Sequence, residues 1–565
     1  MKTKRLLAAL FVLFAMSANL WAVEVTINGI KYDVIKKGKT AKVLSNSPKY
    51  SGNIVIPETV EYEGVECNVT AVANSAFSSC SNLISVSIPD NVTELGEYTF
   101  NGSSKLSTVH LGTGITAIRK YSFKNCSVLT TINIPSTVTE IGEDAFYNCK
   151  ALSSISLPDG LETINNNAFL GSGLTQVIMG DGLKTIGSSA FYGCSNLAQA
   201  VIGSNVTSIG QSAFEKCPLT SVKIPNSVTS MGSYVFEECN KLLSVQIGSG
   251  LTEIPERTFY KCTELMSVYI IGNNITRIGS CAFSKCANLI VMKFPSSVKE
   301  IESEAFSYCT QLYNLDFNEG LTTIGSSAFA YCTDLHNVIM SNSMTNIGFS
   351  AFGSCTKLEK VWIGSGMKDI GSYAFENCEN LTDLYCYAVQ PPSAYSSAFS
   401  NSYPEYITLY VPAESVETYK KTTPWSSFGT IVATDGSTPH PPVLEKCATP
   451  TINVNGDRVS FSCATEGATF MYDVKPTCQQ NGVGGDLRLI SAFTVSVYAT
   501  KSGYDNSDVA TKDIVVNTKK GDVNDDGHVT ITDAVSVVNI ILSGEASAPK
   551  MDTPDIEPVE ATEPE

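Results

Sequence analysis

Phenylalanine recurs at nearly constant spacing through most of this 565-residue chain. Fourteen Phe residues, from Phe77 to Phe375, divide 298 residues into thirteen steps of about 23 residues each. Three residues after each Phe comes a second column, which contains twelve cysteines and two serines. A unit of this length cannot bury its own apolar side, so similar units have to stack on one another. The repeat therefore predicts a solenoid.

Residues 141–158, Ile-Gly-Glu-Asp-Ala-Phe-Tyr-Asn-Cys-Lys-Ala-Leu-Ser-Ser-Ile-Ser-Leu-Pro, represent the repeated unit. The Ala-Phe-x-x-Cys segment that ends at Cys149 has the spacing of one short helical turn. Leu152, Ile155 and Leu157 have the spacing of a single strand, which the following proline ends because it lacks an amide hydrogen. We therefore expect a long parallel sheet with short helical turns, in which each Phe ring packs on the ring of the next unit.

This unit resembles that of the BspA-type leucine-rich repeat family of bacterial surface proteins, which reads approximately I-G-x-x-A-F-x-x-C-x-x-L-x-x-V-x-I-P. The resemblance covers about residues 68–385, or about 14 units of 23 residues. Residues 23–67, with Gly-Ile-Lys-Tyr at 29–32, are similar to the family's N-terminal cap, and residues 386–434 to its C-terminal cap. The resemblance implies a secreted or cell-surface adhesion role, with host matrix proteins, bacterial surface proteins or glycans as ligands.

The outward side chains of the expected sheet change character along the chain. Alternate residues of a strand point to opposite faces, so one outward column runs from Ser87 to Tyr385. Exposed Trp and Tyr side chains on a rigid sheet are typical anchors for ligands. We therefore expect a ligand face where this column and its neighbour become aromatic and charged, at Tyr269, Lys293, Asp316, Lys360, Trp362, Asp383 and Tyr385. The alternative is that these rings cover their neighbours as ordinary strand surface.

Twelve of the eighteen cysteines lie in the repeat column. Column neighbours would lie one strand apart, a distance that a disulfide tolerates, but a stacked interior favours small buried thiols in register. We expect mostly buried free thiols in this column. The remaining cysteines could include a disulfide whose pairing the sequence does not specify: Cys67, Cys281, Cys386, Cys447, Cys463 and Cys478.

The N-terminus predicts export from the cell. Three basic residues among the first five precede an apolar run from Leu6 to Met16 and then small residues, which is typical of a secretory signal peptide. We expect residues 1–22 to be cleaved after Ala22, with cleavage at Ala18 as the alternative. The apolar run is too short to span a bilayer, and no later segment predicts a transmembrane helix. The expected location is secreted or at the cell surface.

Charge and composition argue against several functions. The formal net charge is −17 and there is no Lys/Arg-rich block, so nucleic acid is not an expected partner. The chain has only four histidines and lacks G-x-S-x-G, H-E-x-x-H, P-loop and G-x-G-x-x-G motifs. No inserted loop interrupts the repeat to build a pocket, where active sites are commonly found. We therefore expect a protein that is not an enzyme.

The 23-residue period ends before the C-terminal modules begin. Residues 435–446 are rich in Pro, Ser and Thr and are expected to form a linker. Residues 447–517 contain short strand-like runs between Gly and Asn turns, which predicts a small all-β sandwich. This segment weakly resembles the fibronectin-III-like or chitobiase C-terminal-like spacer domains of secreted bacterial proteins. Residues 545–565 are acidic and Pro-rich, so we expect a disordered tail.

The strongest chemical motif in the chain lies at residues 521–533, Gly-Asp-Val-Asn-Asp-Asp-Gly-His-Val-Thr-Ile-Thr-Asp. Oxygen-bearing residues occupy loop positions 1, 3, 5, 9 and 12 and a glycine occupies position 6, which is the arrangement of a calcium loop. Hard oxygen ligands at this spacing select Ca²⁺. The predicted ligands are Asp522, Asn524, Asp526, the backbone carbonyl of His528, Thr530 and Asp533. The alternative is an acidic turn that binds no metal.

Residues 518–544 combine this loop with a helix expected from Ala534 to Leu542, and together they resemble half of a type I dockerin. Such modules dock onto cohesin domains in glycan-degrading assemblies, so the resemblance implies calcium as cofactor and a cohesin as partner. Dockerins carry two such loops, whereas residues 543–565 contain none.

The expected fold class is therefore a repeat solenoid followed by a small all-β sandwich and a single calcium-loop–helix module. The leading functional hypothesis is a non-catalytic, adhesin-like recognition protein that binds a protein or glycan through its leucine-rich repeat face. The alternative hypothesis is a non-catalytic component of a secreted polysaccharide-degrading assembly, attached through residues 518–544.

Overall fold

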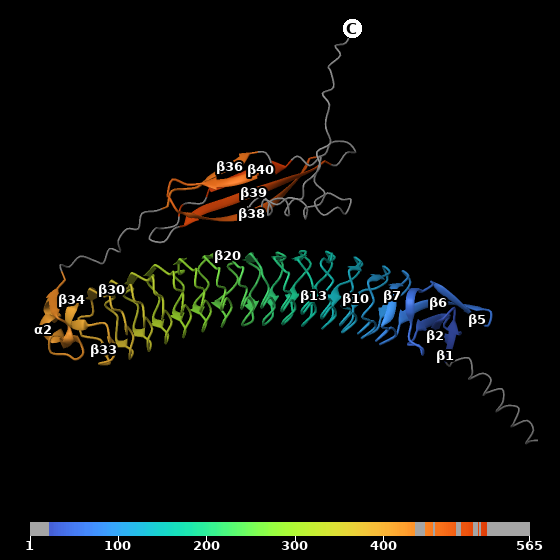
Figure 1. The fold of residues 1–565 in the computed structure, drawn as a ribbon, viewed down its shortest axis with the longest axis horizontal. Helices are drawn as coiled ribbons and strands as arrows, with labels where there is room; N and C mark the ends of the chain where they lie inside the picture. Colours follow the sequence, from blue (N-terminus) through green and yellow to red (C-terminus); the bar gives the residue numbers. More distant parts are fainter. Residues whose placement is uncertain are drawn as a thin grey trace, which may run out of the picture. The chain divides into compact units, whose positions relative to one another are not determined.

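The structure, a computed structural model, describes residues 22–434, 447–455, 458–481, 488–500, 507 and 510–516. The chain divides into two compact units, Met1–Pro441 and Pro442–Glu565. The first unit is a solenoid of parallel strands (Figure 1), which confirms the predicted solenoid. The predicted calcium-loop–helix module, the predicted linker, the predicted disordered tail and most of the predicted signal peptide lie outside the described residues.

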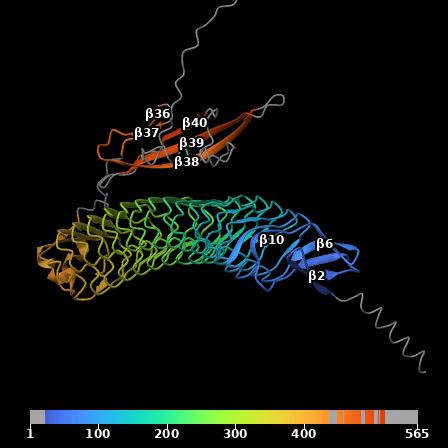
Figure 2. The same ribbon diagram turned by 45° about the vertical axis from the view of Figure 1, so that its right-hand side comes forward.

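Two sets of parallel strands run along the solenoid (Figure 2). Strand pairing divides each set into shorter sheets, and β8 (Glu94–Leu95) pairs with β6 (Val65–Val72); we call the complete sets the first sheet and the second sheet. The first sheet consists of β4 (Ser51–Val55), β7 (Asn82–Ser87), β9 (Thr108–His110), β11 (Thr131–Ile132), β14 (Gln176–Ile178), β16 (Gln199–Val201), β18 (Ser221–Ile224), β20 (Ser244–Ile247), β22 (Ser267–Ile270), β24 (Val291–Met292), β26 (Asn314–Asp316), β28 (Asn337–Ile339), β30 (Lys360–Ile363), β32 (Asp383–Cys386), β34 (Thr408–Val411) and β35 (Thr430–Ala433). The second sheet consists of two-residue strands: β8 (Glu94–Leu95), β10 (Ala117–Ile118), β12 (Glu140–Ile141), β13 (Thr163–Ile164), β15 (Thr185–Ile186), β17 (Ser208–Ile209), β19 (Ser230–Met231), β21 (Glu253–Ile254), β23 (Arg277–Ile278), β25 (Glu300–Ile301), β27 (Thr323–Ile324), β29 (Asn346–Ile347), β31 (Asp369–Ile370) and β33 (Ser393–Ala394).

The first sheet is interrupted where the sequence predicts a strand over residues 152–157. Strand pairing stops at β11 and resumes at β14, and residues 152–157 form no strand; pairing is also absent between β16 and β18 and between β24 and β26. Leu152 is fully buried, but Ile155 and Leu157 are only partly buried. The segment therefore lacks the close packing that holds the neighbouring strands in the sheet.

The Ala-Phe-x-x-Cys segments form hydrogen-bonded turns and not helices, so the prediction of short helical turns is wrong. Two residues in each unit, such as Tyr121 (φ 59°) and Asn125 (φ 61°), have the left-handed conformation, which a right-handed helix does not accept. The amides of Tyr121 and Phe123 donate to the carbonyls of Glu143 and Ala145 in the next unit, at 2.9 and 2.8 Å. We call this third ladder the turn edge; in each unit it comprises the residues from four before the column Phe to three after it.

The core of the solenoid is a stack of side chains in register. The column Phe rings lie face to face with their neighbours at centroid distances of 5.1–5.6 Å, which confirms the predicted stacking. The stack extends beyond the predicted repeat to Phe399, whose ring lies 5.5 Å from that of Phe375. Apolar burial of this kind is the main stabilising contribution to folding.

The column cysteines are buried free thiols with a constant contact. Cys126 donates its S–H to the carbonyl of Phe100 at 3.2 Å, and later column cysteines make the same contact at 3.1–3.3 Å. Ser103 makes it with a hydroxyl, to the carbonyl of Phe77 at 2.7 Å. All cysteines whose side chains the structure describes are free, which confirms the expectation for the column.

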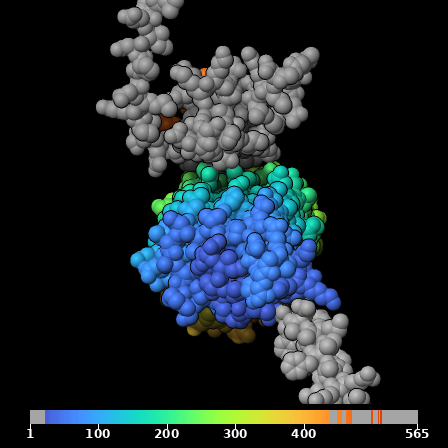
Figure 3. All heavy atoms as spheres, turned by 90° about the vertical axis from the view of Figure 1, so that its right-hand side faces the viewer, coloured from blue at the N-terminus to red at the C-terminus, as the bar shows by residue number. Residues whose placement is uncertain are grey.

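Both ends of the solenoid are covered. The N-terminal cap is formed by β1 (Val23–Ile27), β2 (Ile30–Ile35), β3 (Thr40–Val43), β5 (Thr59–Tyr62) and β6 (Val65–Val72), and its surface is seen end-on in Figure 3. Tyr50 packs its ring 4.8 Å from that of Phe77. At the other end, the buried ring of Trp425 lies against Phe399 at 6.0 Å and donates its N–H to the carbonyl of Pro392. The caps shield apolar side chains that the end units would otherwise expose.

Within the described residues, helical structure is confined to the C-terminal cap. It consists of η2 (Pro404–Tyr406), η3 (Ala413–Ser415), α2 (Val416–Tyr419) and η4 (Trp425–Ser427). No helix in this part of the chain is both long enough and apolar enough to cross a membrane.

The second unit contains antiparallel strands. The strand β36 (Thr451–Asn455) pairs with β37 (Arg458–Ser462), and β39 (Arg488–Thr500) pairs with both β38 (Thr469–Asn481) and β40 (Ala510–Val516). Packing of these two sheets into a sandwich stays a prediction.

Candidate functional site

The predicted ligand face lies on the outer side of the first sheet, where the strand register aligns aromatic residues. Trp362 on β30, Tyr385 on β32 and Tyr410 on β34 are direct neighbours across the three strands. The Trp362 and Tyr385 rings stack at a centroid distance of 5.4 Å, and the Tyr385 and Tyr410 rings at 4.4 Å, both with planes 8° apart. Sequence analysis missed Tyr410 because this residue falls in the predicted C-terminal cap. The repeat register, carried one strand further, would have found it.

An ion pair lies beside this aromatic stack. Lys360 Nζ lies 3.6 Å from Asp383 Oδ2, and the two residues face each other in the register of β30 and β32. The Tyr410 hydroxyl donates to Asp383 Oδ1 at 3.2 Å. Burial, and then the negative charge of Asp383, raises the pKa of Tyr410, so this hydroxyl remains a donor at neutral pH. The C-terminal end of the first sheet thus combines stacked aromatic rings with an ion pair whose carboxylate accepts a hydrogen bond from one of those rings.

The structure corrects the expected exposure of Trp362. Its side chain is only 7% exposed, because its in-register neighbours Ile339 and Tyr385 flank the ring on either side. In this respect Trp362 follows the alternative in which the rings cover one another. Tyr385 is half-buried, whereas Tyr269, which lies further toward the N-terminus, is 56% exposed.

The predicted face therefore falls into two groups. Lys360, Trp362, Asp383 and Tyr385 come together on β30 and β32. The other three residues lie on earlier units: Tyr269 on β22, Lys293 directly after β24, and Asp316 on β26. All three are exposed.

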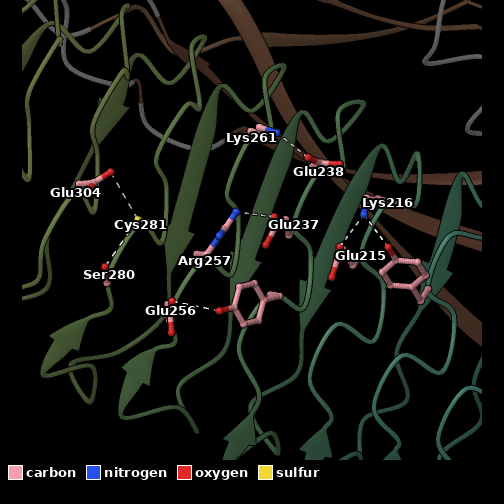
Figure 4. Close-up of polar contacts among 12 residues, drawn as sticks. Glu215, Lys216, Glu237, Glu238, Glu256, Arg257, Lys261, Ser280, Cys281 and Glu304 are labelled. Carbon is pink, nitrogen blue, oxygen red and sulfur yellow. Dashed lines mark hydrogen bonds and ion pairs between the residues drawn. The ribbon is translucent and has the colours of Figure 1, made fainter.

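A second polar cluster, which sequence analysis missed, lies on the turn edge (Figure 4). The Arg257 guanidinium lies over the rings of Tyr234 and Tyr260, at 5.4 and 4.1 Å from their centroids. Its Nη2 atom contacts Glu237 Oε1 at 2.8 Å, and Glu237 is only 8% exposed. Burial raises the pKa of this carboxyl group, against the opposing effect of Arg257. The pair links two consecutive units.

Further ion pairs and cation–ring contacts extend this cluster. Lys261 Nζ contacts Glu238 Oε1 at 2.8 Å, and Lys216 Nζ donates to the Tyr192 hydroxyl at 2.6 Å. The Lys285 ammonium lies 5.3 Å from the Tyr260 ring centroid. The signal for the cluster was present in the sequence, because Lys216, Glu238, Lys261 and Lys285 each follow a column Phe by two residues.

Cys281 lies on this part of the turn edge but does not belong to the repeat column of cysteines. Figure 4 shows it between Ser280 and Glu304. Its sulfur lies 3.7 Å from Ser280 Oγ and 3.9 Å from Glu304 Oε2. Burial raises the pKa of this thiol, so the reactive thiolate is disfavoured at neutral pH. The contacts of this cluster therefore join neighbouring repeat units to one another.

The structure does not test the predicted calcium site. Among the described residues, no group of three or more His, Cys, Asp or Glu side chains is placed to hold a metal ion. The predicted calcium ligands at residues 522–533 lie outside these residues.

Solved structures similar to this chain include leucine-rich repeat proteins. One from Bacteroides ovatus is 27% identical over 56% of this chain and 95% of its own, with a TM-score of 0.41. A leucine-rich cell surface protein from Faecalibacterium prausnitzii is 24% identical over 64% of this chain and 94% of its own, with a TM-score of 0.36. The pneumococcal vaccine antigen PcpA is 19% identical over 74% of this chain and its whole length, with a TM-score of 0.38.

Family comparison gives a match that spans more than half of the chain. No curated protein matches the chain. The family model for the BspA type leucine rich repeat region matches residues 70–198, 162–290 and 252–382, in six copies. These residues hold the Phe stack and the cysteine contacts described above, and so the chain belongs to the BspA-type leucine-rich repeat family.

Proposed function

We propose that this chain is a non-catalytic recognition protein, secreted or held at the cell surface, whose solenoid binds a protein or glycan ligand. The observation that carries the proposal is the aromatic and ionic cluster on the first sheet at Lys360, Trp362, Asp383, Tyr385 and Tyr410. The export signal predicted in residues 1–22 supports the location.

The cluster suits recognition for a physical reason. Stacked rings and a charge pair held by a sheet lose little conformational freedom when a ligand binds, which lowers the entropic cost of association. Tyr and Trp are enriched among the residues that dominate binding energy at interfaces. Tyr385 and Tyr410 would offer apolar contact, while Lys360 and Asp383 would fix the orientation of a polar ligand. Exposed Tyr269 would extend the contact toward the N-terminus.

A second candidate function rests on the C-terminal motif. Residues 518–544 would bind Ca²⁺ through Asp522, Asn524, Asp526, the His528 carbonyl, Thr530 and Asp533, and would attach the chain to a cohesin in a polysaccharide-degrading assembly. The loop spacing favours this proposal, and the single loop distinguishes the chain from two-loop dockerins.

A capture experiment separates the two candidates. Mature protein with and without residues 519–565 is immobilised and exposed to host matrix proteins and to secreted bacterial proteins, in calcium and in chelator. Capture that persists without the C-terminal residues supports recognition by the solenoid. Capture that requires both these residues and calcium supports the assembly candidate and contradicts the first.

A variant pair places any captured ligand on the solenoid. Tyr385→Ala should weaken capture, because it removes the central ring of the stack. Tyr98→Ala, which removes a stacked ring from the turn edge instead, is the matched control and should leave capture unchanged. Equal capture by both variants would remove the proposed face.

A further inference from the structure

From residue 210 to residue 402, the turn edge contains two stretches of contrasting chemistry. The first, which we call the ionic stretch, consists of residues 210–217, 232–239, 255–262, 279–286 and 302–309. Its charged side chains are Glu215, Lys216, Glu237, Glu238, Glu256, Arg257, Lys261, Lys285, Glu302 and Glu304. The next four units, at residues 325–332, 348–355, 371–378 and 395–402, carry only Glu376. We call this second group the serine–aromatic stretch. Neighbouring units with one backbone plan thus present an ionic surface and then an almost uncharged one.

Four aromatic side chains project from the serine–aromatic stretch, one from each unit. Their exposed fractions are 44% for Tyr331, 52% for Phe349, 37% for Tyr373 and 65% for Tyr395. The four side chains come from different positions within their turns, whereas the core Phe residues occupy one column. Large exposed apolar side chains that gather on one surface are typical of interaction sites.

The rings of the two stretches differ in what covers them, except that Tyr331 stacks on Tyr308 of the ionic stretch with centroids 4.4 Å apart. On the ionic stretch, Tyr260 lies under Arg257 at 4.1 Å and near Lys285 at 5.3 Å. On the serine–aromatic stretch, Phe349 and Tyr373 meet edge to face, with centroids 5.5 Å apart and planes at 71°. No cation lies over either of these two rings among the described residues. Their geometry leaves ring faces open to a ligand.

Serines occupy the same four turns as these rings. Within the described residues, the structure shows no hydrogen bond from the hydroxyls of Ser326, Ser327, Ser350, Ser354, Ser372, Ser396, Ser397 and Ser400. Each of these serines is exposed or half-buried, so its donor and acceptor are available at the surface. The stretch therefore offers open ring faces beside free hydroxyl groups.

The chemistry of this surface selects its ligand. A polyanion would be repelled by a chain of net charge −17 and would find no cation on the stretch. An apolar partner would bury the serine hydroxyls without hydrogen bonds, which is unfavourable. A neutral sugar polymer matches both features, because its C–H faces can pack on the aromatic rings and its hydroxyl groups can form hydrogen bonds with the serine hydroxyls.

We propose that the serine–aromatic stretch binds a neutral polysaccharide. The units lie side by side along the solenoid, so an extended polymer can contact several of them, and weak contacts at successive units then add up to useful avidity. This surface is separate from the cluster on the first sheet, and its ligand need not be the ligand of that cluster. Failure of one proposal therefore leaves the other standing.

Affinity electrophoresis of the mature chain tests the proposal. Native gels contain hydroxyethylcellulose, galactomannan or glycogen as neutral polymers, or polygalacturonate as the anionic one. We expect retardation by at least one neutral polymer, retained at high salt, and none by polygalacturonate. The double variant Phe349→Ala/Tyr395→Ala should weaken that retardation about tenfold, because it removes two of the four exposed rings.

Two single variants are the controls. Tyr192→Ala and Tyr98→Ala each remove a ring from the part of the turn edge that precedes the serine–aromatic stretch, and both should keep the retardation. Circular dichroism confirms folding, and Tyr395→Ala alone, at the most exposed ring, replaces the double variant if that one unfolds.

Three results would overturn the proposal. These are no retardation by any neutral polymer, unchanged retardation in the folded variants, and retardation by polygalacturonate alone. Self-association that the double variant abolishes, without binding of sugar, would instead identify a second copy of this chain as the occupant.

Discussion

The interior and the outer surface of the solenoid follow opposite rules. Inside, each unit repeats the same contacts, such as the stacking of Phe214 on Phe236 at 5.6 Å and the donation from Cys239 to the Phe214 carbonyl at 3.2 Å. Outside, neighbouring units differ, so Arg257 and Phe349 occur on the same turn edge with unrelated partners. The periodic part of each unit determines the fold, whereas departures from the period create the surfaces that can recognise a ligand.

The largest effect is expected from breaking an interior contact. Phe214→Ala leaves a cavity between two stacked rings in a fully buried position, so we expect a loss of about 3–5 kcal/mol in the free energy of unfolding. Denaturant titration followed by circular dichroism measures it. Tyr269→Ala, on an exposed ring, is the matched control. A loss below about 1 kcal/mol would show that the stack is not the main source of stability.

A smaller effect is expected from the ionic stretch of the turn edge. Arg257→Ala leaves the buried Glu237 carboxylate without its cation, which should cost about 2 kcal/mol of unfolding free energy. Glu237→Gln retains a polar side chain and should cost less. Thermal or denaturant unfolding of both variants checks this order. If Glu237→Gln is the more destabilising variant, the cost of burying an unpaired Glu237 carboxylate does not explain the contribution of this ion pair to stability.

A still smaller effect on stability is expected from removing one hydrogen bond of the cysteine column. Burial raises the pKa of the Cys239 thiol, so it remains a protonated donor to the Phe214 carbonyl at neutral pH. Cys239→Ser retains a donor, as Ser103 does naturally, whereas Cys239→Ala removes it. We expect the Ala variant to be about 1 kcal/mol less stable than the Ser variant. Equal stabilities in denaturant titration would mean that thiol volume, and not the hydrogen bond, explains the column.

The smallest effect on stability is expected at the outer surface. Tyr385→Ala on β32 removes a half-buried ring outside the core, so the unfolding free energy should change by roughly 1 kcal/mol or less. Thermal unfolding measures it. A loss as large as that of Phe214→Ala would assign the aromatic stack to the fold and remove the contrast between interior and surface.

Periodicity predicted the solenoid, the Phe stack and the buried thiols because each depends on which residues recur inside every unit. The helical turn was wrong because the spacing of Ala-Phe-x-x-Cys also fits a turn with two left-handed residues. Asn125 and Gly102 were the available signal, since Asn and Gly accept positive φ more readily than other residues.

The candidate site was harder to predict than the fold. Strand alternation gave the direction of Trp362 correctly but not its 7% exposure, because the cover comes from neighbouring strands in register. The turn-edge cluster was missed because residues such as Glu237 and Lys261 fall in segments that were expected to form a helical turn. Their contacts join consecutive units, and no single unit shows them.

One measurement tests the central claim, that recognition lies in outward side chains which the fold does not need. The mature chain ending at Thr518 is compared with its Lys360→Ala/Tyr385→Ala/Tyr410→Ala variant, and thermal unfolding and capture of matrix or secreted proteins are measured on the same preparations. We expect nearly equal unfolding temperatures and loss of capture in the variant. Capture that is unchanged in the folded variant, or that falls only together with the unfolding temperature, would contradict it.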